Sequence, residues 1–257
     1  MRAVALDYYA DTDTSEAAQA ALAVKPGLYG FDDGDLLAKA SRLAPAKDFP
    51  LVYGSGLLPA AAHSLLFLAG SNAIEPIGFN RLHHISTPTH PFLFAGATEA
   101  RALHNQVKAE ITTYAKEISQ TLSLRGLNSL DFLIYGNACF ILELNCRPSA
   151  TLALYDADFK AGILAAHIRA CLDGSLEPAR ERKSVKGFKV VIAEQALTIP
   201  AGFEWPLGCF DRPKQASTVS KGDPLCTLEA QGASEAECHK QLDRKEQMLL
   251  NQLLKDN

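Results

Sequence analysis

Residues 130–148 read LDFLIYGNACFILELNCRP, two apolar runs joined at Gly136-Asn137. Glycine and asparagine tolerate the positive φ angles of tight turns, so the stretch predicts a β-hairpin. The turn pairs the two strands and brings Asp131 close to Glu143. Because side chains alternate between the two faces of a strand, Glu143, Asn145 and Arg147 are expected to share one face. The hairpin therefore gathers two carboxylates, an amide oxygen and a guanidinium.

These four side chains suit a divalent cation that carries polyphosphate. Mg²⁺ prefers oxygen ligands such as carboxylates, and a guanidinium binds phosphate or carboxylate oxygens. A plainer interpretation stays open, in which Glu143 and Arg147 form a solvated pair and Asp131 only begins a strand. Cys146 is expected to face the other side of the strand and to pack there rather than act as a nucleophile.

The rest of the chain predicts an α/β protein. Strand, helix and strand alternate up to Leu57, which indicates a small parallel sheet. After it, HSLLFLAGSNAIEPIGF (63–79) predicts a second hairpin around Gly70-Ser71-Asn72. Apolar residues at three- and four-residue spacing predict helices over 98–122, 155–172 and from Ser234 onwards. Between the last two helices, residues 186–200 and 221–230 predict strands.

Composition restricts the class of partner. The chain has 257 residues, 47% of them hydrophobic and 21% charged, with a net charge of -4. That balance argues against a broad nucleic-acid surface, and no apolar run approaches the roughly 20 residues of a membrane span. The first residues lack the features of a signal peptide, and the six cysteines are scattered singly. We therefore expect a cytoplasmic protein with reduced thiols.

The segment resembles the ATP-grasp superfamily, whose magnesium site combines an acidic residue on one strand with Glu-x-Asn-x-Arg on the next. Asp131 and Glu143-Leu144-Asn145-Cys146-Arg147 occupy these positions. Pro148-Ser149-Ala150, Leu154-Tyr155 and residues 205–213 look most like a subgroup of predicted ATP-dependent carboligases related to biotin carboxylase.

The resemblance implies ATP and Mg²⁺ as cofactors, with Asp131, Glu143 and Asn145 as metal ligands. It also implies that Arg147 stabilises a phosphoryl-acyl intermediate while a small carboxylate is joined to an amine or a similar nucleophile. Relatives in the subgroup occur in microbes that build pterin- and furan-type one-carbon carriers, so a ligation step in such a pathway is one hypothesis for the substrate.

The sequence departs from the family pattern before the hairpin at His63–Phe79. Family members hold the nucleotide between two lobes, and the first lobe supplies lysines, a glycine-rich flap and the adenine hinge. Here that hairpin already resembles the second lobe, so we expect the first lobe to be absent. Each charge-assisted hydrogen bond lost with it is worth about 1.5–3 kcal/mol.

The expected organisation is a pre-ATP-grasp-like α/β domain over residues 1–57, followed by an ATP-grasp-like α+β lobe with antiparallel strands over residues 58–257. One functional hypothesis is an ATP- and Mg²⁺-dependent ligase whose nucleotide site is unusual or is completed by a second subunit. Another is a non-catalytic relative that serves as a binding or scaffold subunit. A third is metal or anion binding without turnover. The partners considered are a small-molecule substrate and either another protein or a second copy of the chain.

Overall fold

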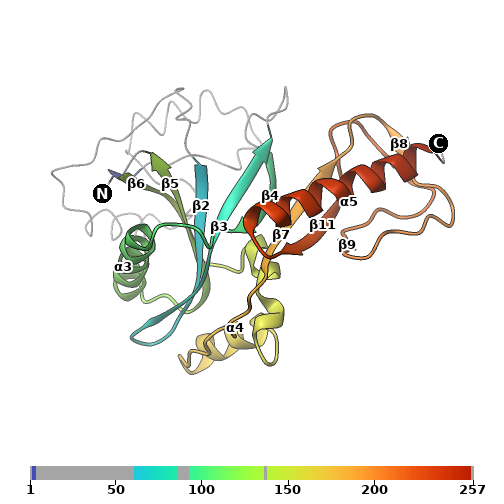
Figure 1. Cartoon of the computed structure of the whole chain (residues 1–257). Helices are drawn as coiled ribbons and strands as arrows, with labels where there is room; N and C mark the ends of the chain where they lie inside the picture. Colours follow the sequence, from blue (N-terminus) through green and yellow to red (C-terminus); the bar gives the residue numbers. More distant parts are fainter. Residues whose placement is uncertain (1, 4–60, 86–92, 136–137, 256–257) are drawn as a thin grey trace, which may run out of the picture. The chain divides into compact units, whose positions relative to one another are not determined.

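The computed structural model describes residues 2–3, 61–85, 93–135 and 138–255. This part of the chain is mixed α/β with mostly antiparallel strands, as predicted (Figure 1). It divides into two compact units. The first unit comprises Met1–Asn80 and Leu103–Glu181, and the second comprises Arg81–Ala102 and Arg182–Asn257. The predicted boundary at residue 57 lies outside the described residues and stays a prediction.

The first unit is built on strands in the order β1, β6, β5, β2, β3. Their bounds are β1 Arg2–Ala3, β2 Ala61–Ala69, β3 Ile74–Ile85, β5 Gly126–Tyr135 and β6 Ala138–Asn145. Strand β3 continues into the second unit from Arg81. The hairpin β5–β6 is antiparallel and β2 pairs antiparallel with β5, whereas β1 pairs parallel with β6. Strands β2 and β3 are neighbours in the sheet, and Gly70 N–H donates to Ala73 O in the turn between them, so both predicted hairpins are confirmed, although the turn at 136–137 is outside the described residues.

Helix α3 (Asn105–Leu122) covers one face of these strands. Its buried residues Ile111, Ala115 and Ser119 recur every four positions and so lie on one side of the helix. Ile111 and Ala115 pack into an apolar cluster with residues of the strands, including Leu65, Phe67, Leu130, Phe132, Ile141 and Leu144. The helix begins later than predicted, because Thr98 belongs to a strand and His104 caps the first turn by accepting a hydrogen bond from Gln106 N–H.

The segment after β6 also differs from the prediction of one helix over 155–172. It forms two 3-10 turns, η1 (Ala150–Leu154) and η2 (Asp156–Asp158), and then helix α4 (Ile163–Leu172). The side chain of Asp156 accepts a hydrogen bond from Ile163 N–H at 2.9 Å, so it caps the real start of α4 from the preceding turn.

The second unit orders its strands β3, β4, β7, β11, β9 and adds a small pair, β8 with β10. The bounds are β4 Leu93–Glu99, β7 Val185–Ile192, β8 Leu197–Thr198, β9 Cys209–Phe210, β10 Thr218–Val219 and β11 Pro224–Gly232. Helix α5 (Glu235–Lys255) lies along β11 and β7 (Figure 1). Its buried Leu242, Leu249 and Leu253 close an apolar core against the strands.

The start of α5 confirms the predicted capping box. Ser234 Oγ accepts a hydrogen bond from Glu237 N–H at 3.2 Å, and the Glu237 carboxylate accepts one from Ala233 N–H at 2.9 Å. Two backbone donors at the helix start are thus satisfied by side chains.

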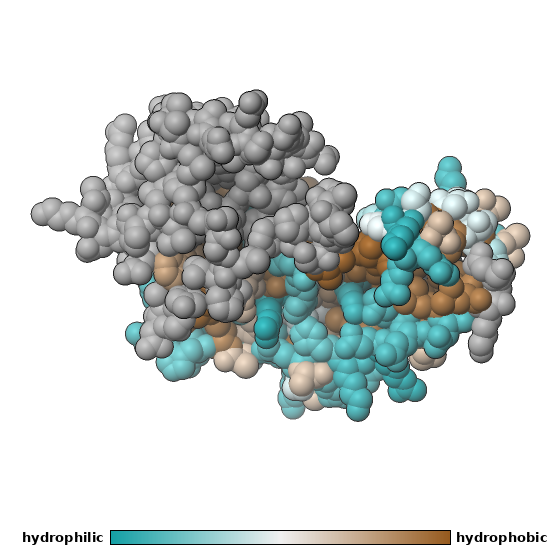
Figure 2. Space-filling view, turned by 90° about the horizontal axis from the view of Figure 1, so that it is seen from above, coloured by the Kyte–Doolittle hydropathy of each residue, from teal (hydrophilic) through white to brown (hydrophobic). Residues whose placement is uncertain are grey.

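The described surface is mixed in character. Figure 2 shows hydrophilic residues over much of the visible described surface, with apolar residues gathered in patches. Large apolar side chains that are exposed include Leu172, Leu207 and Met248. Among the described helices, none has the length and apolar character needed to span a membrane.

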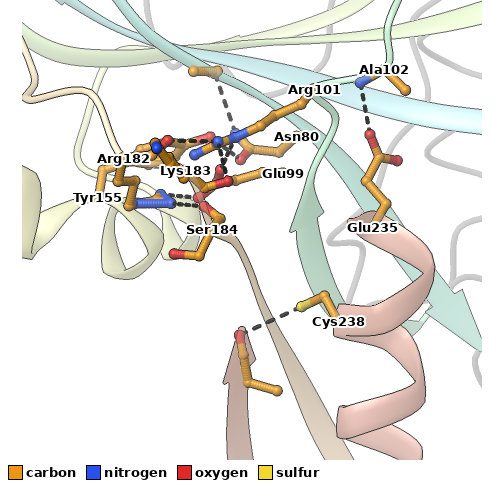
Figure 3. A network of polar contacts seen from close by, with 12 residues as sticks. Asn80, Glu99, Arg101, Ala102, Tyr155, Arg182, Lys183, Ser184, Glu235 and Cys238 are labelled. Atoms are coloured by element: carbon orange, nitrogen blue, oxygen red, sulfur yellow. Dashed lines mark hydrogen bonds and ion pairs between the residues drawn. The ribbon is translucent and has the colours of Figure 1, made fainter. Parts of the chain in front are cut away.

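A buried ion network holds together the two chain segments of the second unit (Figure 3). The side chain of Glu99, at the end of β4, is only 3% exposed and lies between two arginines. Arg101 Nε donates to Glu99 at 2.9 Å, and Arg182 donates to the other carboxylate oxygen. Arg101 also donates to the backbone carbonyls of Arg182 and Lys183, at 2.7 and 3.0 Å. The two arginines therefore pair the charge of Glu99, and Arg101 also satisfies two backbone carbonyls. An unpaired carboxylate would be costly at this buried position.

Candidate metal centre

The β5–β6 hairpin places Asp131 directly opposite Glu143, and Ser129 opposite Asn145. A regular ladder would not do so. Tyr135 pairs with Ala138 and Phe132 with Ile141, so uninterrupted pairing would set Asp131 opposite Leu142. The register shifts between Asp131 and Phe132, which leaves Leu142 as the extra residue of a β-bulge. The bulge is what puts the two carboxylates on the same face of the hairpin.

That face lies opposite the face covered by α3, and it also carries the buried Leu66 and Leu68 of β2. Leu130, Phe132 and Leu144 belong to the apolar cluster under α3. Their neighbours in sequence, Asp131 and Glu143, point the other way because side chains alternate along a strand. The paired strand β2 adds Ser64, which is the ladder partner of Asp131. One row across β2, β5 and β6 therefore carries a hydroxyl and two carboxylates.

Burial and charge act together on Asp131. Burial, followed by the charge of the facing Glu143, raises the pKa of its carboxyl from 3.8 to about 8. Arg147 acts in the opposite direction and lowers that pKa. The balance shows that the guanidinium offsets only part of the cost of two neighbouring carboxylates, so a further positive charge would stabilise the ionised pair.

Arg147 and Cys146 follow the end of β6 at Asn145. Arg147 is exposed and donates to the backbone carbonyl of Pro148 at 3.3 Å, and its charge still reaches Asp131. Cys146 is exposed, so the prediction that it packs was wrong, because the strand ends before it can turn its side chain to the apolar face.

The donor set fits Mg²⁺ in its chemistry. Asp131, Glu143 and Asn145 supply two carboxylates and an amide, the oxygen ligands that this cation accepts alongside water and phosphate. Within the described residues no three His, Cys, Asp or Glu side chains gather as a ready-made metal site, and here the third oxygen comes from an amide. The geometry brings the predicted residues together, while their role as ligands stays a prediction.

A line of buried polar residues, which was not predicted as part of the site, leads to the same row. Tyr155 Oη donates to Asn80 Oδ1 at 2.7 Å (Figure 3), and Asn80 Nδ2 donates to Ser64 Oγ at 3.3 Å. All three residues are buried, and Asn80 is fully inaccessible. Sequence patterns give little warning of such a line. The only signals were a serine and an asparagine within otherwise apolar or mixed strand segments.

The described second unit holds another residue with metal-binding chemistry, His83. Within the second unit, His83 Nε2 forms a hydrogen bond with Thr98 Oγ1 at 3.0 Å, and the imidazole ring contacts the ring of His239 edge-on. Burial, followed by the charge of His239, lowers the pKa of His83 to about 4, so this imidazole is neutral at physiological pH. It is a half-buried histidine whose Nε2 is hydrogen-bonded.

Comparison with known proteins shows what this fold is similar to. Residues 50–151 match the family model of the ATP-grasp domain, and this stretch includes the hairpin and all four predicted site residues. No curated protein matches the sequence.

Several solved structures share the fold at low sequence identity. N5-carboxyaminoimidazole synthase from Aspergillus clavatus, solved with ADP and 5-aminoimidazole ribonucleotide, matches with a TM-score of 0.56 at 9% identity, over 73% of this chain and 51% of that one. The biotin carboxylase complex with β-γ-ATP from Campylobacter jejuni matches with a TM-score of 0.55 at 12% identity, over 72% and 45%. The L-amino acid ligase from Bacillus licheniformis matches with a TM-score of 0.58 at 9% identity, over 74% and 53%.

The chain thus spans about half the length of the solved structures it matches.

Proposed function

We propose that the chain binds ATP with Mg²⁺ at the β5–β6 hairpin and uses it to ligate a small carboxylate to an amine or a similar nucleophile. The observation that carries the proposal is the bulged register that sets Asp131 opposite Glu143 and Asn145 opposite Ser129. A sheet gains nothing in stability from two facing carboxylates on a partly buried face, whereas a cation site needs them.

Each residue has a distinct part in the proposal. Asp131, Glu143 and Asn145 would hold the ion, which when bound would neutralise the charge of the phosphates. Arg147 is exposed beyond the strand end, where its guanidinium can meet a phosphoryl or acyl oxygen and stabilise charge that develops there. The face that carries Asp131 and Glu143 and the apolar face under α3 are separated by the sheet, so the site is anchored by the core without being filled by it.

The finer parts of the proposal rest on resemblance. The nucleotide-bound relatives support ATP as a ligand. A small-molecule acid as substrate, a step in the synthesis of pterin- or furan-type carriers, a cytoplasmic setting and completion of the site by another protein or a second copy belong to the hypothesis. The alternative is a non-catalytic ATP-grasp relative that acts as a binding or scaffold subunit.

A ligand titration tests the proposal. Thermal unfolding and calorimetry would be run with ATP, ADP and a non-hydrolysable ATP analogue, each with and without Mg²⁺. A ligand that binds only the folded state adds RT ln(1 + [L]/Kd), about 2.7 kcal/mol at 100 times Kd. We expect a Mg²⁺-dependent gain in stability for the wild type and none for Glu143→Ala.

The matched control is Glu117→Ala, which removes an exposed carboxylate from α3. It should keep the full ligand-induced gain. If the folded wild type shows no gain at millimolar nucleotide, the ligase proposal fails and the scaffold alternative takes its place. Phosphate release with candidate acids and amines then separates turnover from binding.

A further inference from the structure

The line Tyr155–Asn80–Ser64 has a fixed direction. Tyr155 Oη donates to Asn80 Oδ1, so the amide oxygen is committed to the tyrosine. The amide nitrogen must then face Ser64, and Nδ2 donates to Ser64 Oγ at 3.3 Å. Because the serine oxygen accepts this bond, its own proton is left for another acceptor. The orientation of each group thus determines that of the next.

Tyr155 is held rigidly at the start of this line. It is 4% exposed and packs against Gly78 of β3. A Cβ atom at position 78 would lie 2.2 Å from Tyr155 Oη, so only glycine leaves room for the ring. The hydroxyl is therefore placed by packing as well as by its hydrogen bond to Asn80.

Ser64 brings the line to the candidate metal centre. It is buried on β2, and its ladder partner on β5 is Asp131. Facing residues of neighbouring strands have Cβ atoms about 4.5–5.5 Å apart, which is within reach of a hydroxyl and a carboxylate. Asp131 in turn faces Glu143.

We propose that Tyr155 and Asn80 act through Ser64 as positioning residues for Asp131. They keep the Ser64 hydroxyl oriented so that it donates to the Asp131 carboxylate and holds one oxygen in place, while the other oxygen is presented to the cation. The first two hydrogen bonds belong to the structure, and the third is the inference. The inference rests on the proposed function, because it assigns a supporting shell to the same metal centre.

Metal binding by the full chain tests this role, with Mn²⁺ as the probe because free Mn²⁺ is measured directly by electron paramagnetic resonance. Ser64→Ala removes the final donor, and Tyr155→Phe removes only the distant hydroxyl while keeping the ring on Gly78. Mutating a residue that is hydrogen-bonded to a metal ligand typically lowers the metal affinity by about 10–100-fold. We expect Ser64→Ala to weaken Mn²⁺ binding at least about tenfold, and Tyr155→Phe to weaken it by less.

Ser119→Ala is the matched control. It removes another buried serine hydroxyl, which donates to Ala115 O at 2.6 Å on helix α3, away from the face that carries Asp131. Its loss of stability should resemble that of Ser64→Ala, and its Mn²⁺ affinity should equal that of the wild type. A purely structural role for the line predicts equal affinities in all these variants.

The outcomes separate this inference from the proposed function. If the wild type binds Mn²⁺, Glu143→Ala does not, and both Ser64→Ala and Tyr155→Phe bind like the wild type, the positioning role is overturned while the metal centre stands. If the wild type fails to bind Mn²⁺ with and without ATP, both are overturned. Should Ser64→Ala fail to fold, Tyr155→Phe alone decides, since it leaves the packing against Gly78 in place.

Discussion

Replacing Asp131 by asparagine is expected to stabilise the metal-free protein at pH 8. Burial and the charge of Glu143 raise the pKa of this carboxyl from 3.8 to about 8, so the folded state holds a proton that the unfolded state releases. Asparagine keeps the size and polarity of the side chain and never needs that proton. The site is thus predicted to cost stability when it is empty, as functional sites often do.

The sign of the effect defines its pH range. For a carboxyl whose folded pKa is raised, stability is fully present below the unfolded pKa and is lost as pH rises towards the folded pKa. The difference between Asp131→Asn and the wild type should therefore be small near pH 4, grow up to about pH 8 and then level off. Each pKa unit corresponds to about 1.4 kcal/mol, so the gain near pH 8 should be on the order of 2 kcal/mol or more.

Urea unfolding followed by far-ultraviolet circular dichroism, in EDTA and at a series of pH values, measures this difference. Asp173→Asn is the control, because that exposed carboxylate accepts a hydrogen bond from Ser175 N–H at 2.8 Å, and this contact with Ser175 lowers its pKa. It should show no such gain. Adding Mg²⁺ should stabilise the wild type and not Asp131→Asn. A wild type more stable than Asp131→Asn at pH 8 without metal would contradict the prediction.

Replacing Glu99 by alanine is expected to cost about 3–5 kcal/mol of unfolding free energy in the second unit. Two guanidinium groups, from Arg101 and Arg182, share this buried carboxylate (Figure 3). Without it, Arg182 stays largely buried beside another positive charge. Arg101 would also lose the partner that fixes its bonds to the backbone before β7.

The single tryptophan offers a direct measurement. Trp205 packs against the core of the second unit and contacts Phe203 edge-on, so its fluorescence reports the unfolding of that unit. Asp243→Ala is the control from the same unit, since Asp243 is 63% exposed in its pair with Lys189. Exposed pairs contribute about 0–1 kcal/mol. If Glu99→Ala costs no more than Asp243→Ala, the network is a surface feature in energetic terms.

Sequence patterns predicted those features that depend on local rules. The hairpins at Gly70-Ser71-Asn72 and Gly136-Asn137 follow from turn residues between apolar runs, and the start of α5 follows from the capping box at Ser234. The face shared by Glu143 and Asn145 follows from alternation along one strand. These predictions need no knowledge of distant parts of the chain.

Other features depend on contacts that sequence spacing does not encode. Counting from the turn alone would put Leu142 opposite Asp131, and the bulge at Leu142 shifts that register by one residue. The helix predicted over 155–172 begins only at Ile163, because the chain first makes two 3-10 turns that bury Tyr155. The link from Tyr155 to Ser64 joins three elements far apart in sequence, and no periodicity predicts it.

The order of these contacts along the chain bears on how the molecule folds. Asp131 and Glu143 meet through a hairpin. Closing such a short loop costs little conformational entropy, and a hairpin forms within about microseconds. Ser64 and Asp131 meet only when β2 has found β5 across a long intervening stretch of chain, a contact of high order that forms slowly. The candidate ligands Asp131 and Glu143 are therefore close to each other in sequence, whereas Ser64, which is proposed to hold Asp131, is far from both. A chain that has formed only this hairpin already carries the facing carboxylates, and the later pairing of β2 brings the hydroxyl that holds one of them in place.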